Sequence, residues 1–142
     1  MKYLLDTNII SERSKPVPQA ACLEWLSLHQ RDCAISTITL AELRYGVERL
    51  PDGKRKRDLA RKLDFLRQDH RESVLTFDEA ASAEWGRYLA ALERHFGQGV
   101  LQQLDYPDTQ NAAIARAHGL IIATNNEKDF PTVDTVNPWK EI

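Results

Sequence analysis

The chain has 142 residues, with 19 Lys and Arg against 21 Asp and Glu, so its formal net charge is -2. Charged residues make up 28% and apolar residues 42%, which excludes a disordered tail, a collagen-like repeat and a histone-like polycation. No apolar run approaches the roughly 18–20 residues of a membrane-spanning helix, and Cys22 and Cys33 lack the spacing of a zinc site. We therefore expect a soluble, cytoplasmic protein with a single domain over residues 1–142 and no membrane contact.

Short apolar runs alternate with amphipathic segments in the first half of the chain. Residues 2–5 predict a strand that ends at Asp6, and residues 33–36 predict a second strand. Helices are expected after Pro16 and Pro18, over residues 39–50, and after the turn at residues 51–53, where the exposed face is basic.

The second half repeats this alternation. Residues 73–75 predict a third strand, residues 120–123 a buried strand and residues 135–136 an edge strand. A helix capped by Asp78, or by Thr76 with Glu79, has an apolar stripe that is expected in the core: Trp85, Tyr88, Leu89, Leu92 and Phe96. Another helix begins at Pro107 and ends at His118–Gly119. The alternation predicts an α/β fold with a parallel sheet and helices on both faces.

Four acidic residues are predicted at one edge of this sheet. Asp6 directly follows the first strand, and Asp129 follows the strand over residues 120–123. Glu42 lies one turn inside the helix after the second strand, and Asp108 lies in the first turn of an alanine-rich helix. Because ligands bind beyond the carboxyl ends of such strands, we expect the four side chains to converge.

Converging carboxylates require a counter-ion. Two of them about 4 Å apart repel by roughly 4 kcal/mol at an effective dielectric constant near 20. Mg²⁺ and Mn²⁺ prefer carboxylate oxygens, and metals held in this way promote displacement at phosphorus. The pattern therefore favours phosphodiester hydrolysis.

Most of these acids also have a purely structural explanation. Glu42 stands three residues after Thr39 and could complete a capping box. Asp108 could complement a helix N-terminus, and Asp129 could be a turn residue. Asp6 is harder to explain in this way, because a charged residue that closes an apolar strand needs a polar partner.

Four blocks occur in order along the chain: LLDTNIISE at residues 4–12, STITLAEL at 36–43, DTQNAAIARAHGL at 108–120 and TNNEKDF at 124–130. Together they resemble the motifs of PIN-domain ribonucleases, and most closely those of the VapC-type (FitB-like) toxins of bacterial type II toxin–antitoxin pairs. The likeness continues to residues 137–139 and so covers nearly the whole chain.

The resemblance implies an α/β/α sandwich with a central parallel sheet and an endoribonuclease that depends on Mg²⁺ or Mn²⁺. It implies catalytic roles for Asp6, Glu42, Asp108 and Asp129, with Asp6 and Asp108 as the principal metal ligands. The polar residues that would orient those carboxylates or contact substrate are Thr7, Asn8, Thr39 and Asn126. It further implies a homodimer, held inactive by a small antitoxin whose C-terminal segment enters the active-site groove.

Two positions depart from the family pattern. Asn125 stands where an arginine is common, and Asn111 stands where an apolar residue is usual. Neither change removes an acid, so we expect altered substrate handling rather than an inactive site. Asp105 lies close to Asp108 in sequence, but the alignment to His118–Gly119 favours Asp108 as the catalytic acid.

Several surface residues are candidates for contact with RNA. The basic run of residues 54–62 is either a backbone-binding patch or an ordinary solvated helix face, and the second interpretation is favoured. Arg44, one turn from the acids, is a sharper candidate for a substrate phosphate contact, and Tyr45 or Trp139 could stack on a base. The alternative function is a catalytically weak module that binds RNA or the antitoxin without cutting.

Overall fold

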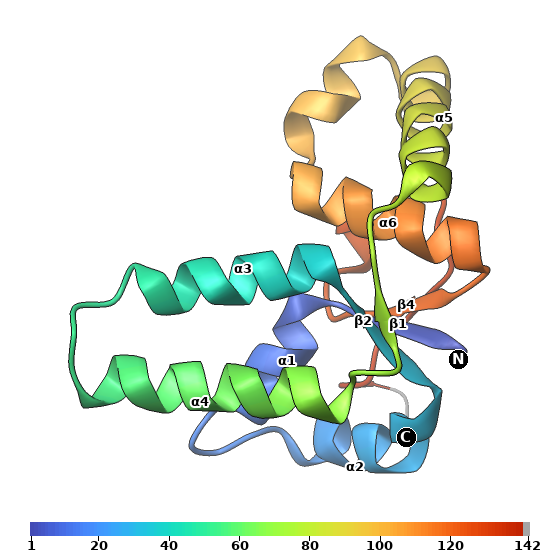
Figure 1. Ribbon diagram of the computed structural model, residues 1–142. Coiled ribbons are helices and arrows are strands. Elements are labelled where there is room, and N and C mark those ends of the chain that lie inside the picture. The colour runs from blue at the N-terminus through green and yellow to red at the C-terminus, as the bar shows by residue number, and fades with distance from the viewer. Residues whose placement is uncertain (141–142) are drawn as a thin grey trace.

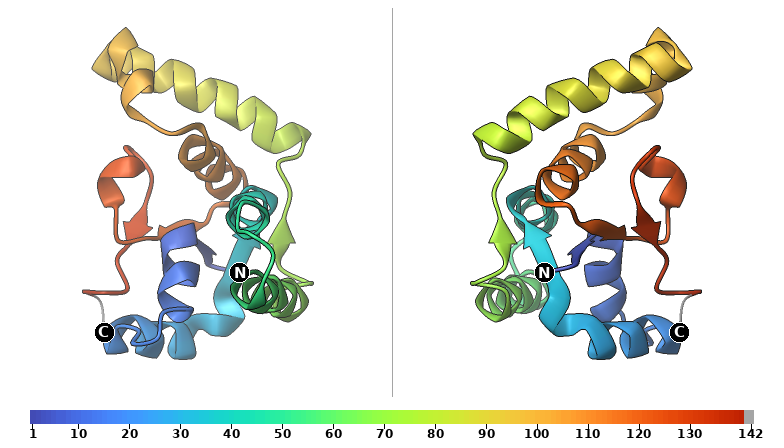
Figure 2. Two further views of the ribbon diagram at one scale, coloured as in Figure 1. Left: turned by 90° about the vertical axis from the view of Figure 1, so that its left-hand side faces the viewer. Right: turned by 90° about the vertical axis from the view of Figure 1, so that its right-hand side faces the viewer.

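The computed structural model describes residues 1–140 and shows a small parallel sheet between helices (Figures 1 and 2). The strands are β1 (Tyr3–Leu5), β2 (Cys33–Ser36), β3 (Val74–Leu75), β4 (Ile121–Ala123) and β5 (Thr135–Val136). The α-helices are α1 (Thr7–Arg13), α2 (Ala20–His29), α3 (Thr37–Glu48), α4 (Lys54–Asp69), α5 (Glu79–Phe96) and α6 (Tyr106–His118). The 3₁₀ helices are η1 (Gln30–Asp32), η2 (Gln98–Gln103) and η3 (Glu127–Asp129).

All five strands are parallel, in the order β3-β2-β1-β4-β5. β1 is central, with Tyr3 beside Cys33 of β2 and Leu5 beside Ala123 of β4. From β1 the chain adds β2 and β3 on one side of the sheet and then crosses over to add β4 and β5 on the other side, so the strand order reverses at β1. In such sheets the crevice between the diverging connections is where ligands bind.

The two faces of the sheet are covered by different helices (Figure 2). Leu5 and Ile35 pack into one apolar cluster with residues of α1, α2 and α4, whereas Leu4 and Ile122 pack into a second cluster with residues of α5 and α6. This alternation follows from the pleat, which sends successive side chains to opposite faces. The predicted α/β/α sandwich is confirmed.

Helices α3 and α4 form a long hairpin that projects from the sheet (Figure 1). α3 begins directly after β2, so its first turns lie at the carboxyl edge of the sheet and its far end extends away from it. Val47 packs with the α4 side of the core and Ile38 with the α5–α6 side. α3 is thus placed between the two layers, beside the crevice.

Three features differ from the sequence predictions. The helix expected after Pro16 begins only at Ala20, and α1, which follows Asp6 without a loop, was not predicted. Phe96, expected in the core, is 51% exposed at the C-terminal end of α5. Within residues 1–140, no helix combines the length and apolar character needed to cross a membrane.

Candidate active site

Asp6 joins two neighbouring strands at their carboxyl ends. It follows β1 and caps the N-terminus of α1, where its Oδ1 accepts a hydrogen bond of 2.8 Å from the backbone N–H of Thr7. Its Oδ2 accepts a bond of 2.8 Å from the hydroxyl of Thr124, the residue that follows β4. Both oxygens are held, so the buried carboxylate has a fixed position at the crevice.

Glu42 is connected to the same place through Thr7. The hydroxyl of Thr7 donates a bond of 2.9 Å to Glu42 Oε1 and lies 3.4 Å from the hydroxyl of Thr39. Ser36 caps α3 by accepting the N–H of Thr39 at 3.0 Å. The capping-box explanation of Glu42 is therefore wrong, because Ser36 is the N-cap and the Glu42 side chain extends across to α1.

Asn111 is part of a buried polar link between α6 and α3. The Ser36 hydroxyl donates to Asn111 Oδ1, and Asn111 Nδ2 donates to the Thr39 hydroxyl at 3.4 Å. Because the chain places a hydroxyl on each side of this position, an amide is better paired here than an apolar side chain would be. This departure from the family pattern thus has local partners.

Several polar groups surround Thr124. Its oxygen accepts hydrogen bonds from Asn8 Nδ2 at 3.2 Å and from the backbone N–H of Asn126 at 3.0 Å, while its hydroxyl donates to Asp6. Asn8 Nδ2 also donates to Asn125 Oδ1 at 2.6 Å. Asn8 and Asn125 are therefore neighbours at the rim of the crevice, and Asn125 supplies an amide where an arginine would supply a charge.

Asp108 shares an electrostatic environment with the other acids. Burial raises its pKa to about 7, and the charges of Asp6, Asp129, Glu42 and Asp105 add to this shift. Asp108 lies in the first turn of α6 and Asp129 in η3, so the charges that act on Asp108 come from separate parts of the chain. The structure thus places all four predicted acids in one region, with Asp105 as a fifth.

Asp6 and Glu42 are also perturbed toward the neutral form. Burial raises the pKa of Asp6, an effect that its hydrogen bonds with Thr124 and Thr7 oppose and the charge of Asp129 increases. Burial likewise raises the pKa of Glu42, opposed by the bond from Thr7 and increased by the charge of Asp6. No cationic side chain of residues 1–140 is among the groups that oppose these shifts, so the ionised acids have no positive partner there.

The side-chain oxygens of this region are of the kind that bind a hard divalent cation. Every acid in the region offers carboxylate oxygen, the ligand that Mg²⁺ and Mn²⁺ prefer, and the buried Asn8 Oδ1 has no hydrogen-bond partner within residues 1–140. In the same part of the chain, no three acidic, imidazole or thiol side chains are close enough to enclose an ion as they stand. The residues fit a metal held by a few carboxylates and water rather than a closed protein cage.

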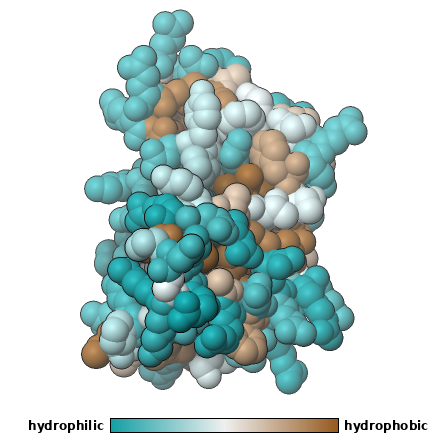
Figure 3. Space-filling model, turned by 60° about the vertical axis from the view of Figure 1, so that its left-hand side comes forward, coloured by the Kyte–Doolittle hydropathy of each residue, from teal (hydrophilic) through white to brown (hydrophobic). Residues whose placement is uncertain are grey.

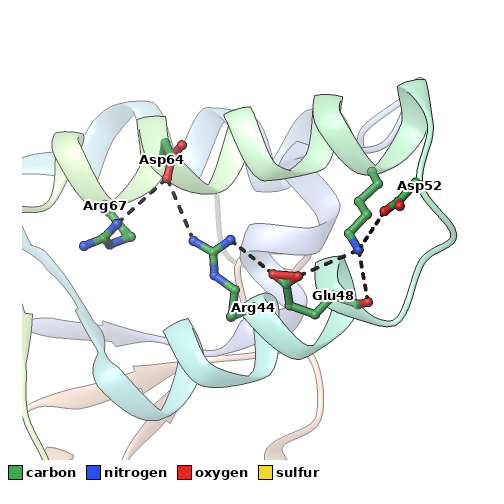
Figure 4. Close-up of polar contacts among 6 residues, drawn as sticks. Arg44, Glu48, Asp52, Asp64 and Arg67 are labelled. Carbon is green, nitrogen blue, oxygen red and sulfur yellow. Dashed lines mark hydrogen bonds and ion pairs between the residues drawn. The ribbon is translucent and has the colours of Figure 1, made fainter.

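Arg44 does not extend toward these acids. Its guanidinium lies 3.8 Å from Glu48 Oε2 and 3.9 Å from Asp64 Oδ1, and Asp64 also pairs with Arg67 at 3.8 Å. Figure 4 shows this cluster spanning the gap between α3 and α4. Arg44 thus bridges the hairpin, and its predicted contact with substrate phosphate would require these pairs to open.

A groove of about 540 Å³ runs between α1 and the α3–α4 hairpin. It begins at Thr7 and Glu42, and its apolar lining includes Ile10, Leu43 and Leu63. Cations stand among its lining residues: Arg13, Arg49, Arg55 and Lys62. Figure 3 shows the side of the molecule toward which the hairpin projects, with hydrophilic residues crowded over its lower half and apolar residues visible between them.

The sequence matches the PIN domain over residues 3–136. The chain belongs to the PIN-domain family. It is 34% identical to "Toxin FitB" of Neisseria gonorrhoeae over 97% of this chain and 99% of that protein. It is 38% identical to "tRNA(fMet)-specific endonuclease VapC" of Shigella flexneri over 94% and 92% of the two chains. The solved "Structure of FitAB bound to IR36 DNA fragment" superimposes with a TM-score of 0.87, at 32% identity, over 99% of this chain and 97% of that chain.

This PIN domain is therefore of the VapC/FitB toxin type. Its site also contains groups that sequence reasoning did not assign. Ser36 ends β2 and caps Thr39, and Thr124 follows β4 and donates to Asp6. A polar residue at the end of an apolar strand is the sequence signal that could have identified both. Glu12 is buried but lies outside the acid cluster, because it pairs with Lys15 at 3.0 Å and accepts the N–H of Gln19.

Proposed function

We propose that this PIN domain is an endoribonuclease toxin that hydrolyses RNA phosphodiester bonds with the help of Mg²⁺ or Mn²⁺. The observation that carries the proposal is the convergence of Asp6, Glu42, Asp108 and Asp129, whose mutual repulsion no cationic side chain within residues 1–140 relieves. The names of the similar proteins, which include a tRNA-specific endonuclease, support the same reaction class.

The carboxylates have distinct roles in this proposal. Asp6 and Asp108 would hold the ion, since Asp6 directly follows β1, Asp108 lies in the first turn of α6, and the charge of Asp6 raises the pKa of Asp108. A bound Mg²⁺ or Mn²⁺ would polarise the phosphodiester and stabilise negative charge that develops on its oxygens. Asp129 would complete the negative pocket from η3, and Thr7 and Thr124 would keep the carboxylates oriented.

Glu42 is the candidate for moving a proton. Its Oε1 is occupied by the Thr7 hydroxyl at 2.9 Å, which leaves Oε2 to accept the proton of the attacking water. Its raised pKa, caused mainly by burial, brings the carboxylate closer to the range of an effective general base. Glu42→Gln should keep the hydrogen bond at Oε1 and lose the base, so full turnover of this variant at saturating metal would contradict the role.

Cleavage of a mixed pool of structured and unstructured RNA tests the reaction. Purified protein should cut with Mn²⁺ and stop cutting with EDTA, and Asp6→Asn should lose cleavage. Asp32→Asn is a matched control, because Asp32 lies in η1 before β2, at the opposite edge of the sheet. Folded wild-type protein that binds RNA but never cuts it would favour the alternative, a binding module.

We further propose that a small antitoxin occupies the groove between α1 and the α3–α4 hairpin. The groove offers apolar contacts with a cationic border, and this combination suits a segment that carries apolar and acidic side chains. It opens at Glu42, so a bound segment would cover the acids. The similar solved structure is a FitAB complex, as its name states. We also propose that the toxin itself forms a homodimer.

The product of a neighbouring short open reading frame provides the test. When the two proteins are produced together, they should co-purify and the complex should not cleave RNA. Phe65 lines the groove and is 60% exposed, so Phe65→Glu should weaken the complex without unfolding the toxin. Unchanged affinity for this variant would place the partner elsewhere. Light scattering of the isolated toxin would report its own oligomeric state.

A further inference from the structure

Tyr45 is an exposed aromatic residue beside the candidate site. It lies one helical turn after Glu42 on α3, and residues three apart share a helix face. Tyr45 is 68% exposed, whereas Leu43 and Val47 on the same helix pack with the core. Tyr45 does not line the groove assigned to the antitoxin, so that assignment leaves its exposure unexplained.

Arg49, the C-cap residue of α3, follows Tyr45 by four positions on the same side of the helix. Its guanidinium carbon lies 5.9 Å from the centroid of the Tyr45 ring, which is a cation–π distance. Neighbouring cations are engaged: Arg44 and Lys56 both pair with Glu48. No acidic side chain within residues 1–140 lies at ion-pair distance from Arg49. The face therefore presents a carboxylate, an aromatic ring and an uncompensated cation in succession.

We infer that Glu42, Tyr45 and Arg49, here called the α3 stripe, form a track for single-stranded RNA that leads away from the acids. Tyr45 would stack on a base next to the cleaved bond, and Arg49 would pair with the following phosphate. Aromatic platforms alternating with cations are how proteins hold single strands without reading their sequence. This inference rests on the proposed function, because it names residues that position the same RNA.

The charge on this face suits RNA. The acids repel a phosphodiester, so an approaching strand needs cations along its path. Arg49 borders the groove together with Arg55, and Lys54 and Arg57 lie with Arg55 in the first turn of α4. A group of cations at the tip of the hairpin suits a polyanion of several phosphates.

Binding can be measured apart from cleavage in the Asp6→Asn background. Fluorescence anisotropy of a labelled single-stranded RNA should show that Tyr45→Ala raises the dissociation constant by at least about fivefold, the effect expected for loss of one stacked base. Tyr45→Phe should retain affinity, because the ring face is kept. Phe96→Ala is the matched control, since Phe96 is an exposed aromatic residue at the end of α5.

Salt dependence tests the cation. Arg49→Gln should reduce the slope of log affinity against log salt by about 0.7, the value for one phosphate contact on a single strand. Arg94→Gln, an exposed substitution in the last turn of α5, should leave the slope unchanged. A substrate lacking the base next to the cleavage site should bind equally to wild type and Tyr45→Ala.

The outcomes separate this inference from the proposed function. Wild-type protein that binds RNA with the predicted sensitivity to Tyr45 but never cuts would overturn the nuclease and support the track. Wild-type protein that cuts RNA, with an unchanged dissociation constant for Tyr45→Ala, would overturn the track alone. A change in molar mass of Tyr45→Ala by light scattering, with RNA affinity intact, would assign the face to a second copy of the chain and also overturn the track.

Discussion

The hydroxyl of Thr124 donates a hydrogen bond of 2.8 Å to Oδ2 of Asp6, which joins residues 118 positions apart in the chain. The contact exists because β1 and β4 are parallel neighbours with Leu5 beside Ala123, so the next residue of each strand reaches the same edge. A buried carboxylate that accepts two hydrogen bonds keeps one orientation. The crevice is therefore organised before any substrate arrives.

Thr124→Val should lower the rate of RNA cleavage by about 10- to 100-fold, the effect typical of losing a group that orients a metal-binding carboxylate. Valine keeps the shape of threonine but cannot donate to Asp6. Single-turnover cleavage at saturating Mn²⁺ measures the loss. Thr124→Ser restores the hydroxyl and should recover most of the rate, whereas equal loss in both variants would point to packing.

Asp108→Asn should stabilise the metal-free protein while removing most of its response to metal. The substitution removes a charge that Asp6, Asp129 and Glu42 repel, so we expect a gain of about 1 kcal/mol, or roughly 2–4 °C in Tm for a chain of this size. Wild-type Tm should rise when Mg²⁺ or Mn²⁺ is added, by mass action on the folded state. Identical melting of both proteins with and without metal would contradict a shared pocket.

The stability of the metal-free protein should fall as the pH rises between about 4 and 7. The folded-state pKa of Asp108 is raised to about 7 from its ordinary value of 3.8, so the folded state binds the proton more tightly than the unfolded state does. The stabilising contribution of the bound proton is complete below the unfolded-state pKa of 3.8 and is lost as the pH rises through the folded-state pKa of about 7. Urea titrations across this range should show the decline, and Asp108→Asn should flatten it.

His70 should act in the opposite direction. Burial lowers its pKa below the ordinary value of 6.5, and the charge of Arg13 adds to that effect. The folded state therefore favours the neutral ring, and protonation in the unfolded state destabilises the fold as the pH falls below 6.5. His70→Gln should weaken this dependence in urea titrations. A steeper loss of stability at low pH in the variant would contradict the argument.

Arg44→Gln should have little effect on either stability or cleavage if the cluster in Figure 4 is its main role. Its pairs with Glu48 and Asp64 are long and exposed to water, and such pairs contribute about 0–1 kcal/mol. Thermal unfolding and cleavage kinetics measure the two effects. A large increase in KM with unchanged Tm would instead support the predicted contact with substrate phosphate.

The sequence determined the type of fold and was enough to name the candidate acids. The parallel sheet was predictable because short apolar runs, typical of buried strands, alternate with amphipathic helices. β2 and β5 begin and end at the predicted residues. The four motif blocks named Asp6, Glu42, Asp108 and Asp129 because those residues keep a recognisable neighbourhood in sequence.

Only the tertiary structure decided how those residues are held. The partner of Glu42 is Thr7 on another helix, and the partner of Asp6 is Thr124 on another strand, so no local pattern contains either pair. The same holds for Arg44, which local spacing placed near the acids but which α4 draws into ion pairs across the hairpin. Spacing along the chain reports which face a residue occupies, whereas its hydrogen-bond partners depend on which elements the sheet order brings side by side.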